Sequence, residues 1–373
     1  MMIKIPAVVM RGGTSKGIFF KKEDLPPEGP ERDKVLMKIF GSGDASQIDG
    51  LGGGQTHTSK AMIVWKSNIS DVDIEYTFGQ IGITEKFIDW TGNCGNLTAA
   101  VAPFAIDEKL LEAKEPYTLV KLYNTNTKKR IDAIVPVEGG VTKYEGNFWI
   151  DGVPNPGSRI DLIWYNPAGS ITGKLLPTGN PKDKIYTGME VIECSIVDAS
   201  NPAIFVRAKD LGLTGKELPG EINKETELKI ERIRSEAAKI MGIVKDAKEA
   251  TTKSPHFPFI ILVAENQDYK TSEGKIIKKK DFHILARVYS MQKMHHAYPV
   301  SGTICTGAAA RIPGTIVNEF FNGEGRKVII GHPKGLIDVD VEIAPRGEIA
   351  DILSVTIART ARRLMSGFAY YIP

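Results

Sequence analysis

Apolar residues recur at helical spacing in several segments of the chain. Residues 31–40 are rich in helix-forming residues, and their apolar positions fall three to four residues apart. Residues 223–241 form a charged stretch for which we also expect a helix. A third helix is predicted after the turn at 92–96, because its apolar residues follow the i, i+3, i+4, i+7 rule: Leu97, Ala100, Val101 and Phe104.

Strand patterns occupy more of the chain than helix patterns. Residues 71–81 alternate apolar and polar positions, which is typical of a half-buried strand, and residues 117–137 predict a hairpin around Asn126. Further strands are expected at 6–10, 61–65, 191–208, 257–265, 281–290, 327–333 and 336–343. Strands with few helices and no regular βαβ alternation indicate an α+β fold.

The domain organisation is predicted from a Gly- and Pro-rich stretch and a weak internal repeat. The stretch at 151–184 leads to an expected boundary near residue 190, giving an N-terminal lobe at 1–190 and a C-terminal lobe at 191–373. In the repeat, Cys94-Gly95-Asn96 of "GNCGNLTAAVAPF" matches Ser301-Gly302-Thr303 of "VSGTICTGAAARIPG". Two similar lobes, each with a central helix, are therefore expected. Whether the last strand returns to the first lobe stays open.

Composition excludes several classes of protein. Hydrophobic residues make up 42% and charged residues 25% of the 373 positions, as in ordinary globular proteins. The net charge is only 48 − 45 = +3, which gives no reason to expect nucleic acid as a partner. The apolar run at the N-terminus is too short for a signal peptide, and no run approaches the ~18 residues of a membrane span. With three dispersed cysteines and no CxxC pair, we expect a cytoplasmic protein without a disulfide framework.

Cys94 lies between two Gly/Asn pairs directly before the helix predicted from Leu97 onward. A helix N-terminus favours the thiolate and binds anions through its unpaired N–H groups. The turn at 92–96 is therefore a candidate carboxylate- or phosphate-binding site that contains a reactive thiol. A buried, inert cysteine beside a tight turn is the alternative. Cys194 and Cys305 are expected to be structural.

Two further segments contain candidate functional residues. The segment "RGGTSKG" at 11–17 has the composition of an anion cradle, or of a cationic turn after a strand. The glycine-rich loop at 51–60 lacks GxGxxG and opens a strand, which excludes dinucleotide binding. At its end, Lys60 is either a desolvated general base or a surface lysine. The histidines show no metal-binding spacing, although His295 and His296 precede the second predicted helix.

Taken together, these segments resemble the PrpF family of methylaconitate and methylitaconate-type isomerases, which is similar in fold to diaminopimelate epimerase. The resemblance rests on "VVMRGGTSKGIFF", "QIDGLGGGQTHTSK", "GNCGNLTAA", "DASNPAIFV", "MHHAYPVSGTICTGAAARIPGT" and "ARRLMSGFAYYIP". It implies two pseudo-symmetric lobes, each a curved β-structure around a central helix, with a substrate cleft between them. It also implies catalytic roles for Lys60 and Cys94 and no metal or organic cofactor.

The implied reaction is a 1,3-allylic proton shift in an unsaturated di- or tricarboxylate such as 3-methylitaconate or 2-methylaconitate. Its carboxylates would be held by Ser15, Lys16, Asn93, Gly95, Asn96, Asn201, His295, Ser301, Gly302 and Thr303. Ser301 stands where epimerase relatives carry a second cysteine, so a two-thiol mechanism is not expected. The alternatives are an amino-acid or hydroxy-acid epimerase and a non-catalytic carboxylate-binding protein. A homodimer or higher homo-oligomer is plausible on family grounds.

Overall fold

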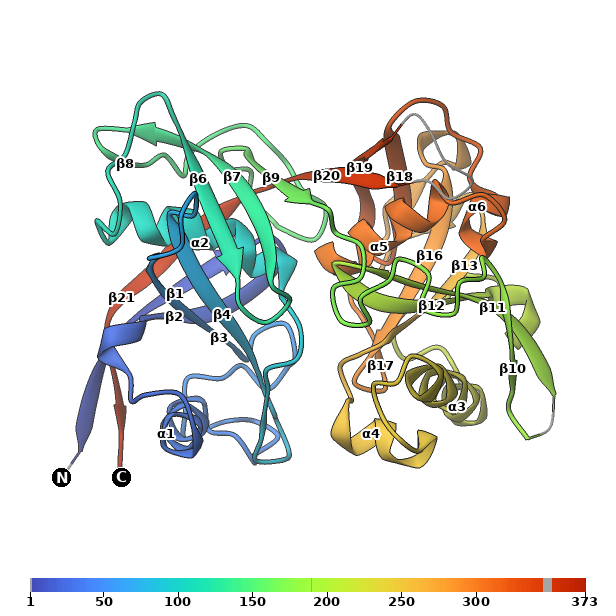
Figure 1. Cartoon of the computed structure of the whole chain (residues 1–373), viewed down its shortest axis with the longest axis horizontal. Coiled ribbons are helices and arrows are strands. Elements are labelled where there is room, and N and C mark those ends of the chain that lie inside the picture. Colours follow the sequence, from blue (N-terminus) through green and yellow to red (C-terminus); the bar gives the residue numbers. More distant parts are fainter. Residues whose placement is uncertain (1, 189, 345–350) are drawn as a thin grey trace. The chain divides into compact units, whose positions relative to one another are not determined.

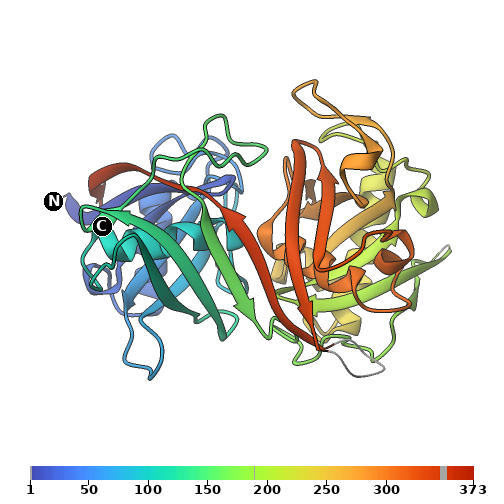
Figure 2. The same ribbon diagram turned by 90° about the horizontal axis from the view of Figure 1, so that it is seen from above.

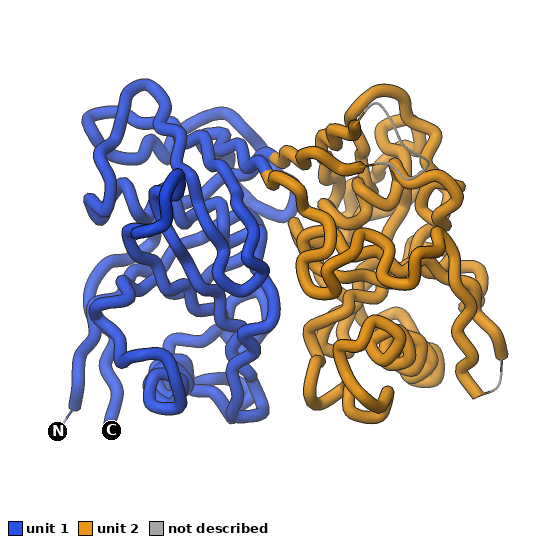
Figure 3. The backbone as a smooth tube through the Cα atoms, viewed as in Figure 1, with its two compact units in different colours: residues 1–163, 358–373 blue, residues 164–357 orange. Residues whose placement is uncertain are grey.

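A computed structural model describes residues 2–188, 190–344 and 351–373. The chain forms two compact units, the first from residues 1–163 and 358–373 and the second from residues 164–357 (Figure 3). The boundary expected near residue 190 falls inside the second unit. The last strand, β21 (Ala361–Tyr371), belongs to the first unit, where it lies antiparallel alongside β1 (Ile3–Gly12) (Figure 1, Figure 2).

Unit 1 is a curved β-structure whose strands pair in a regular order. β1 and β2 form an antiparallel hairpin, β2 pairs parallel with β3, β3 antiparallel with β4, β4 parallel with β6, and β6 antiparallel with β7. The remaining strands are β2 (Ser15–Lys21), β3 (Lys60–Lys66), β4 (Ile74–Ile81), β5 (Ile88–Asp89), β6 (Tyr117–Asn124), β7 (Lys129–Glu138), β8 (Val141–Thr142) and β9 (Ile160–Tyr165), the last of which ends in unit 2.

The helix α2 (Gly95–Asp107) is enclosed by the strands of unit 1, and its residues from Gly95 to Ile106 are all buried. A helix that is apolar all round belongs in the core, which explains its run of alanine and other small residues. The helix α1 (Pro30–Phe40) lies on the outer face of the sheet and buries Val35, Leu36 and Ile39 there. Pro30 begins α1, and Gly41 in the left-handed region ends it. A short 3₁₀ turn, η1 (Lys22–Asp24), precedes α1.

Unit 2 repeats this order of pairings. β11 and β12 are antiparallel, β12 and β13 parallel, β13 and β16 antiparallel, β16 and β18 parallel, and β18 and β19 antiparallel. Its strands are β10 (Asp183–Tyr186), β11 (Val191–Ala199), β12 (Asn201–Arg207), β13 (Phe259–Glu265), β14 (Tyr269–Lys270), β15 (Ile276–Ile277), β16 (Ile284–Ser290), β17 (Lys293–Met294), β18 (Lys327–His332), β19 (Gly335–Ile343) and β20 (Ile352–Arg359), the last of which ends in unit 1.

The helices of unit 2 follow the same plan. α5 (Val300–Ala310) is completely buried, and α2 is buried apart from its last residue, while α3 (Lys224–Ile240) covers the outer face of the sheet, as α1 does. The shorter helical segments are α4 (Ala250–Lys253), α6 (Ile316–Phe320), η2 (Ala208–Leu211), η3 (Ala247–Glu249) and η4 (Lys279–Asp281). The predicted α+β class and the predicted pair of similar units, each with a central helix, are therefore confirmed. Among the helices of the described ranges, none is long and apolar enough to cross a membrane.

One predicted element is wrong. Residues 191–208 were expected to form a single strand, but they form the hairpin of β11 and β12, in which Ala199 pairs directly with Asn201. The reversal takes place at one residue, Ser200, whose φ of 66° is in the left-handed region. Its backbone N–H donates to the Pro167 carbonyl at 2.8 Å, which fixes this turn. Serine rarely adopts this conformation, so nothing in the sequence marked residue 200 as a turn. The apolar residues on both sides of it therefore predicted one continuous strand.

Candidate functional site

Cys94 is the N-cap residue of α2, as the sequence predicted. Its carbonyl accepts the first intrahelical hydrogen bond from the Thr98 N–H at 2.9 Å and a second bond from Thr98 Oγ1 at 3.1 Å. The N–H groups before Thr98 have no carbonyl to bond within the helix, so they form a partially positive site around the thiol. Cys94 is mostly buried, and its Sγ lies 3.9 Å from the Ser15 hydroxyl oxygen.

Lys60 is the first residue of β3 and is only 6% exposed. Its Nζ donates to Gln80 Oε1 at 2.5 Å and lies 4.9 Å from the centre of the Phe78 ring. Burial lowers the pKa of Lys60, because an ammonium loses hydration there, while Cys94 and Asp89 oppose that shift. Of the two alternatives left by the sequence, Lys60 therefore has the environment of a desolvated base.

Gln80 and Asp89 were missed by the sequence analysis. In the strand ladder Lys60 pairs with Gln80, and Gln80 pairs with Asp89, so the three side chains project from the same face of the sheet. Asp89 Oδ1 accepts from the backbone and hydroxyl of Thr91, whereas Oδ2 is buried without a hydrogen-bond partner among the described residues. Only the register of β3, β4 and β5 brings these residues together, and local sequence patterns do not encode it.

Asn93 belongs to a buried network that supports the Cys94 turn. Its Nδ2 donates to the Tyr76 hydroxyl at 2.9 Å, and that hydroxyl lies 2.9 Å from Thr98 Oγ1. Because Thr98 also bonds the Cys94 carbonyl, the network connects strand β4 to the first turn of α2. The Asn93 side chain thus helps to hold the Cys94 turn in place.

Asn96 joins the first turn of α2 to the loop between β1 and β2. Its side-chain amide accepts from the Thr14 N–H at 3.3 Å and donates to Thr14 Oγ1 at 3.2 Å. Gly13 lies against the same amide with a φ of 50°, and a Cβ there would come 2.0 Å from Asn96 Oδ1. This packing sets Ser15 at the start of β2. Lys16 follows half-buried, with its backbone N–H bonded to the His57 carbonyl.

The remaining candidate residues belong to unit 2. Ser301, Gly302 and Thr303 are buried in the first turn of α5, where the Thr303 hydroxyl donates to the Pro299 carbonyl at 3.0 Å. Asn201 begins β12 just as Ser15 begins β2. The strand order therefore gives these two buried residues equivalent places in the two units.

His295 precedes α5 and is half-buried. Its Nδ1 accepts from the Ala297 N–H at 3.0 Å, so the neutral ring carries its proton on Nε2. Within the described ranges, no cluster of three His, Cys, Asp or Glu side chains could hold a metal ion.

The other two thiols are in apolar surroundings. Cys305 lies inside α5, where burial raises the pKa of its thiol and Sγ donates to the Val197 carbonyl at 3.4 Å. Cys194 lies in β11, and burial raises the pKa of its thiol to about 12. Both thiols therefore stay protonated at neutral pH.

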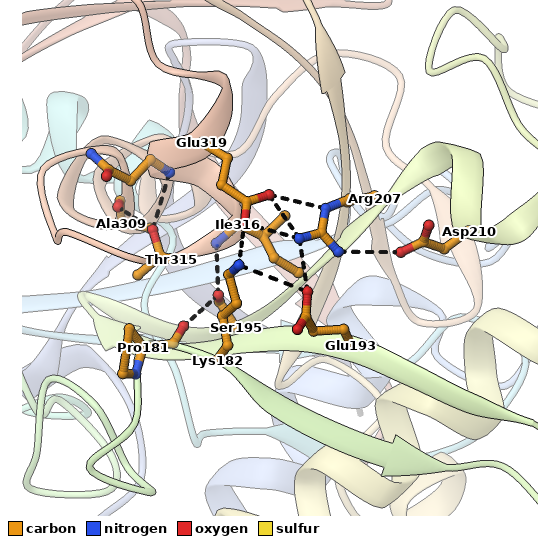
Figure 4. A network of polar contacts seen from close by, with 11 residues as sticks. Pro181, Lys182, Glu193, Ser195, Arg207, Asp210, Ala309, Thr315, Ile316 and Glu319 are labelled. Atoms are coloured by element: carbon orange, nitrogen blue, oxygen red, sulfur yellow. Dashed lines mark hydrogen bonds and ion pairs between the residues drawn. The ribbon is translucent and has the colours of Figure 1, made fainter.

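The far end of α5 is anchored by the polar network of Figure 4. Arg207 of β12 binds Glu319 of α6 through two guanidinium nitrogens at 2.7–3.0 Å, and it also binds Glu193 of β11 at 2.8 Å. Beside them, the buried Ser195 hydroxyl donates to the Pro181 carbonyl at 2.6 Å and accepts from the Ile316 N–H at 2.9 Å. These contacts attach α6, and with it the end of α5, to the sheet.

Comparison with known proteins identifies the family. The sequence model of the PrpF protein family matches residues 2–372. The chain belongs to the PrpF family. The 3-methylitaconate isomerase of Eubacterium barkeri is 46% identical over 99% of this chain and 97% of its own length. The 2-methyl-aconitate isomerase of Shewanella oneidensis is 39% identical over 98% of this chain and 96% of its own length. The predicted PrpF resemblance and the prediction of an isomerase are both confirmed.

Solved structures agree with this assignment. The crystal structure of a methylitaconate-delta-isomerase matches 99% of this PrpF-family chain and 96% of its own, with 44% identity and a TM-score of 0.82. A hydroxyproline epimerase from Agrobacterium vitis covers 98% of this chain and 92% of its own, with a TM-score of 0.55 and 11% identity. The second likeness concerns the fold alone and confirms the predicted diaminopimelate epimerase-like architecture.

Proposed function

We propose that this PrpF-family protein moves a C=C bond by 1,3-allylic proton transfer in an unsaturated di- or tricarboxylate of the 3-methylitaconate type. The observation that carries the proposal is the buried Lys60 amine near the thiol of Cys94, at the N-terminus of a buried helix. The 46% identical relative named 3-methylitaconate isomerase supports this choice of substrate.

Lys60 and Cys94 are the two candidate proton carriers. Because burial lowers its pKa, Lys60 is more often a neutral amine than an exposed lysine is, and a neutral amine can accept the allylic proton. The proton returns at the far carbon of the allyl system, from the protonated amine or from the Cys94 thiol. The reaction only relocates one proton and one double bond, so its balance requires no redox partner or transferred group.

The intermediate is an allylic carbanion whose charge spreads into the substrate's own carboxylate. N–H groups at the start of α2 would stabilise this charge, at ~3–4 kcal/mol for each well-placed donor. In unit 1, Ser15, Lys16, Gly95 and Asn96 are proposed to bind substrate, with Asn93 supporting the turn. In unit 2 the proposed binding residues are Asn201, His295, Ser301, Gly302 and Thr303.

Proton NMR in D₂O tests the proposal. The protein would be incubated with 3-methylitaconate, 2-methylaconitate, cis- and trans-aconitate, 4-oxalomesaconate and diaminopimelate. Vinyl signals should migrate with deuterium uptake, and Lys60→Ala and Cys94→Ser should abolish or strongly slow that migration. Exchange only at the stereocentre of diaminopimelate would replace the proposal with an epimerase, and full turnover by Lys60→Ala would contradict the role of Lys60.

A further inference from the structure

We propose that Gln80 is a positioning residue that aims the Lys60 amine at the substrate carbon. The inference rests on the proposed function of Lys60 as the proton acceptor. Gln80 is completely buried in β4, directly opposite Lys60 in the strand ladder. Its Oε1 accepts the hydrogen bond from Lys60 Nζ at 2.5 Å.

The orientation of the Gln80 amide is fixed by its other end. Nε2 lies 3.2 Å from the Thr56 carbonyl, 3.1 Å from the Ser59 carbonyl and 3.4 Å from the Ile81 carbonyl. Carbonyl oxygens only accept hydrogen bonds, so the NH₂ group must face them and the amide oxygen must face Lys60. A flipped amide would set acceptor against acceptor at all three carbonyls.

The loop that holds this amide is itself fixed by a second buried glutamine. Gln47 Oε1 accepts from the Ser59 hydroxyl at 2.5 Å and from the Gly54 N–H at 2.9 Å. Ser59 in turn presents its carbonyl to Gln80. The glycine-rich loop at 51–60 therefore supplies the carbonyl groups that fix the Gln80 amide, and this amide in turn orients Lys60. The loop sequence alone did not reveal this role.

A neutral amide suits this position better than a carboxylate would. It accepts a hydrogen bond and so restricts the direction of the amine, yet it adds no negative charge that would hold the proton on Lys60. In unit 2, the strand that corresponds to β3 is β13, and its first residue is Phe259. The pair of amine and amide is therefore a feature of unit 1 and marks that unit as the one that transfers the proton.

The decisive variant is Gln80→Glu, which keeps the shape of the side chain and introduces a charge. We expect the acidic limb of the kcat/KM profile, along which the rate rises as Lys60 loses its proton, to move to higher pH by at least about one unit, with at least a tenfold loss of kcat near pH 7. Gln80→Met removes the acceptor and should lower kcat about 10–100-fold with little change in KM. Gln55→Glu makes the same chemical change at an exposed position of the glycine-rich loop at 51–60. It should leave the kcat/KM profile unchanged.

A second readout separates this inference from the function on which it rests. The ¹³Cε resonance of Lys60, assigned with Lys60→Arg, would be titrated in the wild type and in Gln80→Glu without substrate. A higher titration midpoint in Gln80→Glu together with the shifted kcat/KM profile supports the inference. A moved midpoint with an unaltered profile shows that the contact exists but that Lys60 is not the base, so the proposed function fails. An unmoved midpoint overturns the positioning role of Gln80, whatever the activity.

Discussion

The hydroxyl oxygens of Tyr76 and Thr98 lie 2.9 Å apart beneath the Cys94 turn of unit 1. Because Asn93 donates to Tyr76 and Thr98 bonds the Cys94 carbonyl, the Tyr76 hydroxyl is the donor to Thr98. Unit 2 repeats the contact with Tyr298 and Thr306, also at 2.9 Å. Each buried helix is thus attached to a buried tyrosine, α2 in its first turn and α5 in its second.

The first prediction concerns this contact. Tyr76→Phe removes a buried hydroxyl and leaves Asn93 Nδ2 without that acceptor, so it should cost about 1–3 kcal/mol in the free energy of unfolding. Under the proposed mechanism it should also lower kcat, because the Cys94 turn loses its support. Urea unfolding and steady-state kinetics measure the two effects.

Tyr298→Phe is the matched variant in unit 2. The Thr306 hydroxyl bonds the Gly302 carbonyl, within a turn proposed to bind substrate, so we expect this variant mainly to raise KM. If Tyr76→Phe changed KM alone and left kcat intact, the Tyr76 network would not act through Cys94.

A second prediction concerns the close approach of Gly13 to Asn96. Gly13→Ala would place a Cβ 2.0 Å from Asn96 Oδ1 at a φ of 50°, so the loop before Ser15 must shift. Gly139 has a similar φ of 64° but nothing within 4 Å, so Gly139→Ala measures the backbone strain alone. We expect Gly139→Ala to cost about 1 kcal/mol and Gly13→Ala to cost clearly more, with lost activity. Equal unfolding midpoints for the two variants would refute the tight packing.

The sequence predicted the elements best where one local pattern dominates. The spacing of Val35, Leu36 and Ile39 predicted α1, and the alternation of Ile74, Tyr76 and Phe78 predicted β4. The hairpin of β11 and β12 was missed because its reversal at Ser200 uses one left-handed residue inside an apolar run.

The candidate site divides in the same way. Cys94 and its helix start could be predicted, because glycine, asparagine and a following apolar stripe are local signals. Gln80 and Asp89 could not, since their approach to Lys60 depends on the register of three strands. The hydrogen bonds between the Asn96 side chain and Thr14 could not be predicted either, because the two residues are distant in the sequence.

A third prediction tests the network at the far end of α5. Ser195→Ala deletes a buried hydroxyl that bonds the Pro181 carbonyl and the Ile316 N–H, leaving two backbone groups without that partner. We expect a loss of about 1–3 kcal/mol in the free energy of unfolding. Ser366→Ala, at an exposed position of β21, should change it by less than about 0.5 kcal/mol. Equal effects of the two variants would show that the Ser195 contacts contribute nothing net.

The last prediction follows from the burial of Lys60. Burial lowers its pKa in the folded state below the ordinary value of 10.5, so adding a proton to this residue costs more in the folded chain than in the unfolded chain. This residue's contribution therefore disfavours folding at neutral pH, and the penalty fades as pH rises towards 10.5. Lys60→Met should exceed the wild type in unfolding free energy at pH 7, and the difference should shrink by pH 10.

Lys66→Met is the control, because Lys66 is exposed at the other end of the same strand and should show no such pH-dependent difference. Urea unfolding of the three proteins at both pH values measures the effect. A difference between Lys60→Met and wild type that grows with pH would mean that the amine is stabilised as the ammonium. In that case Lys60 would be better suited to donate a proton than to accept one, and the roles proposed for Lys60 and Cys94 would have to be exchanged.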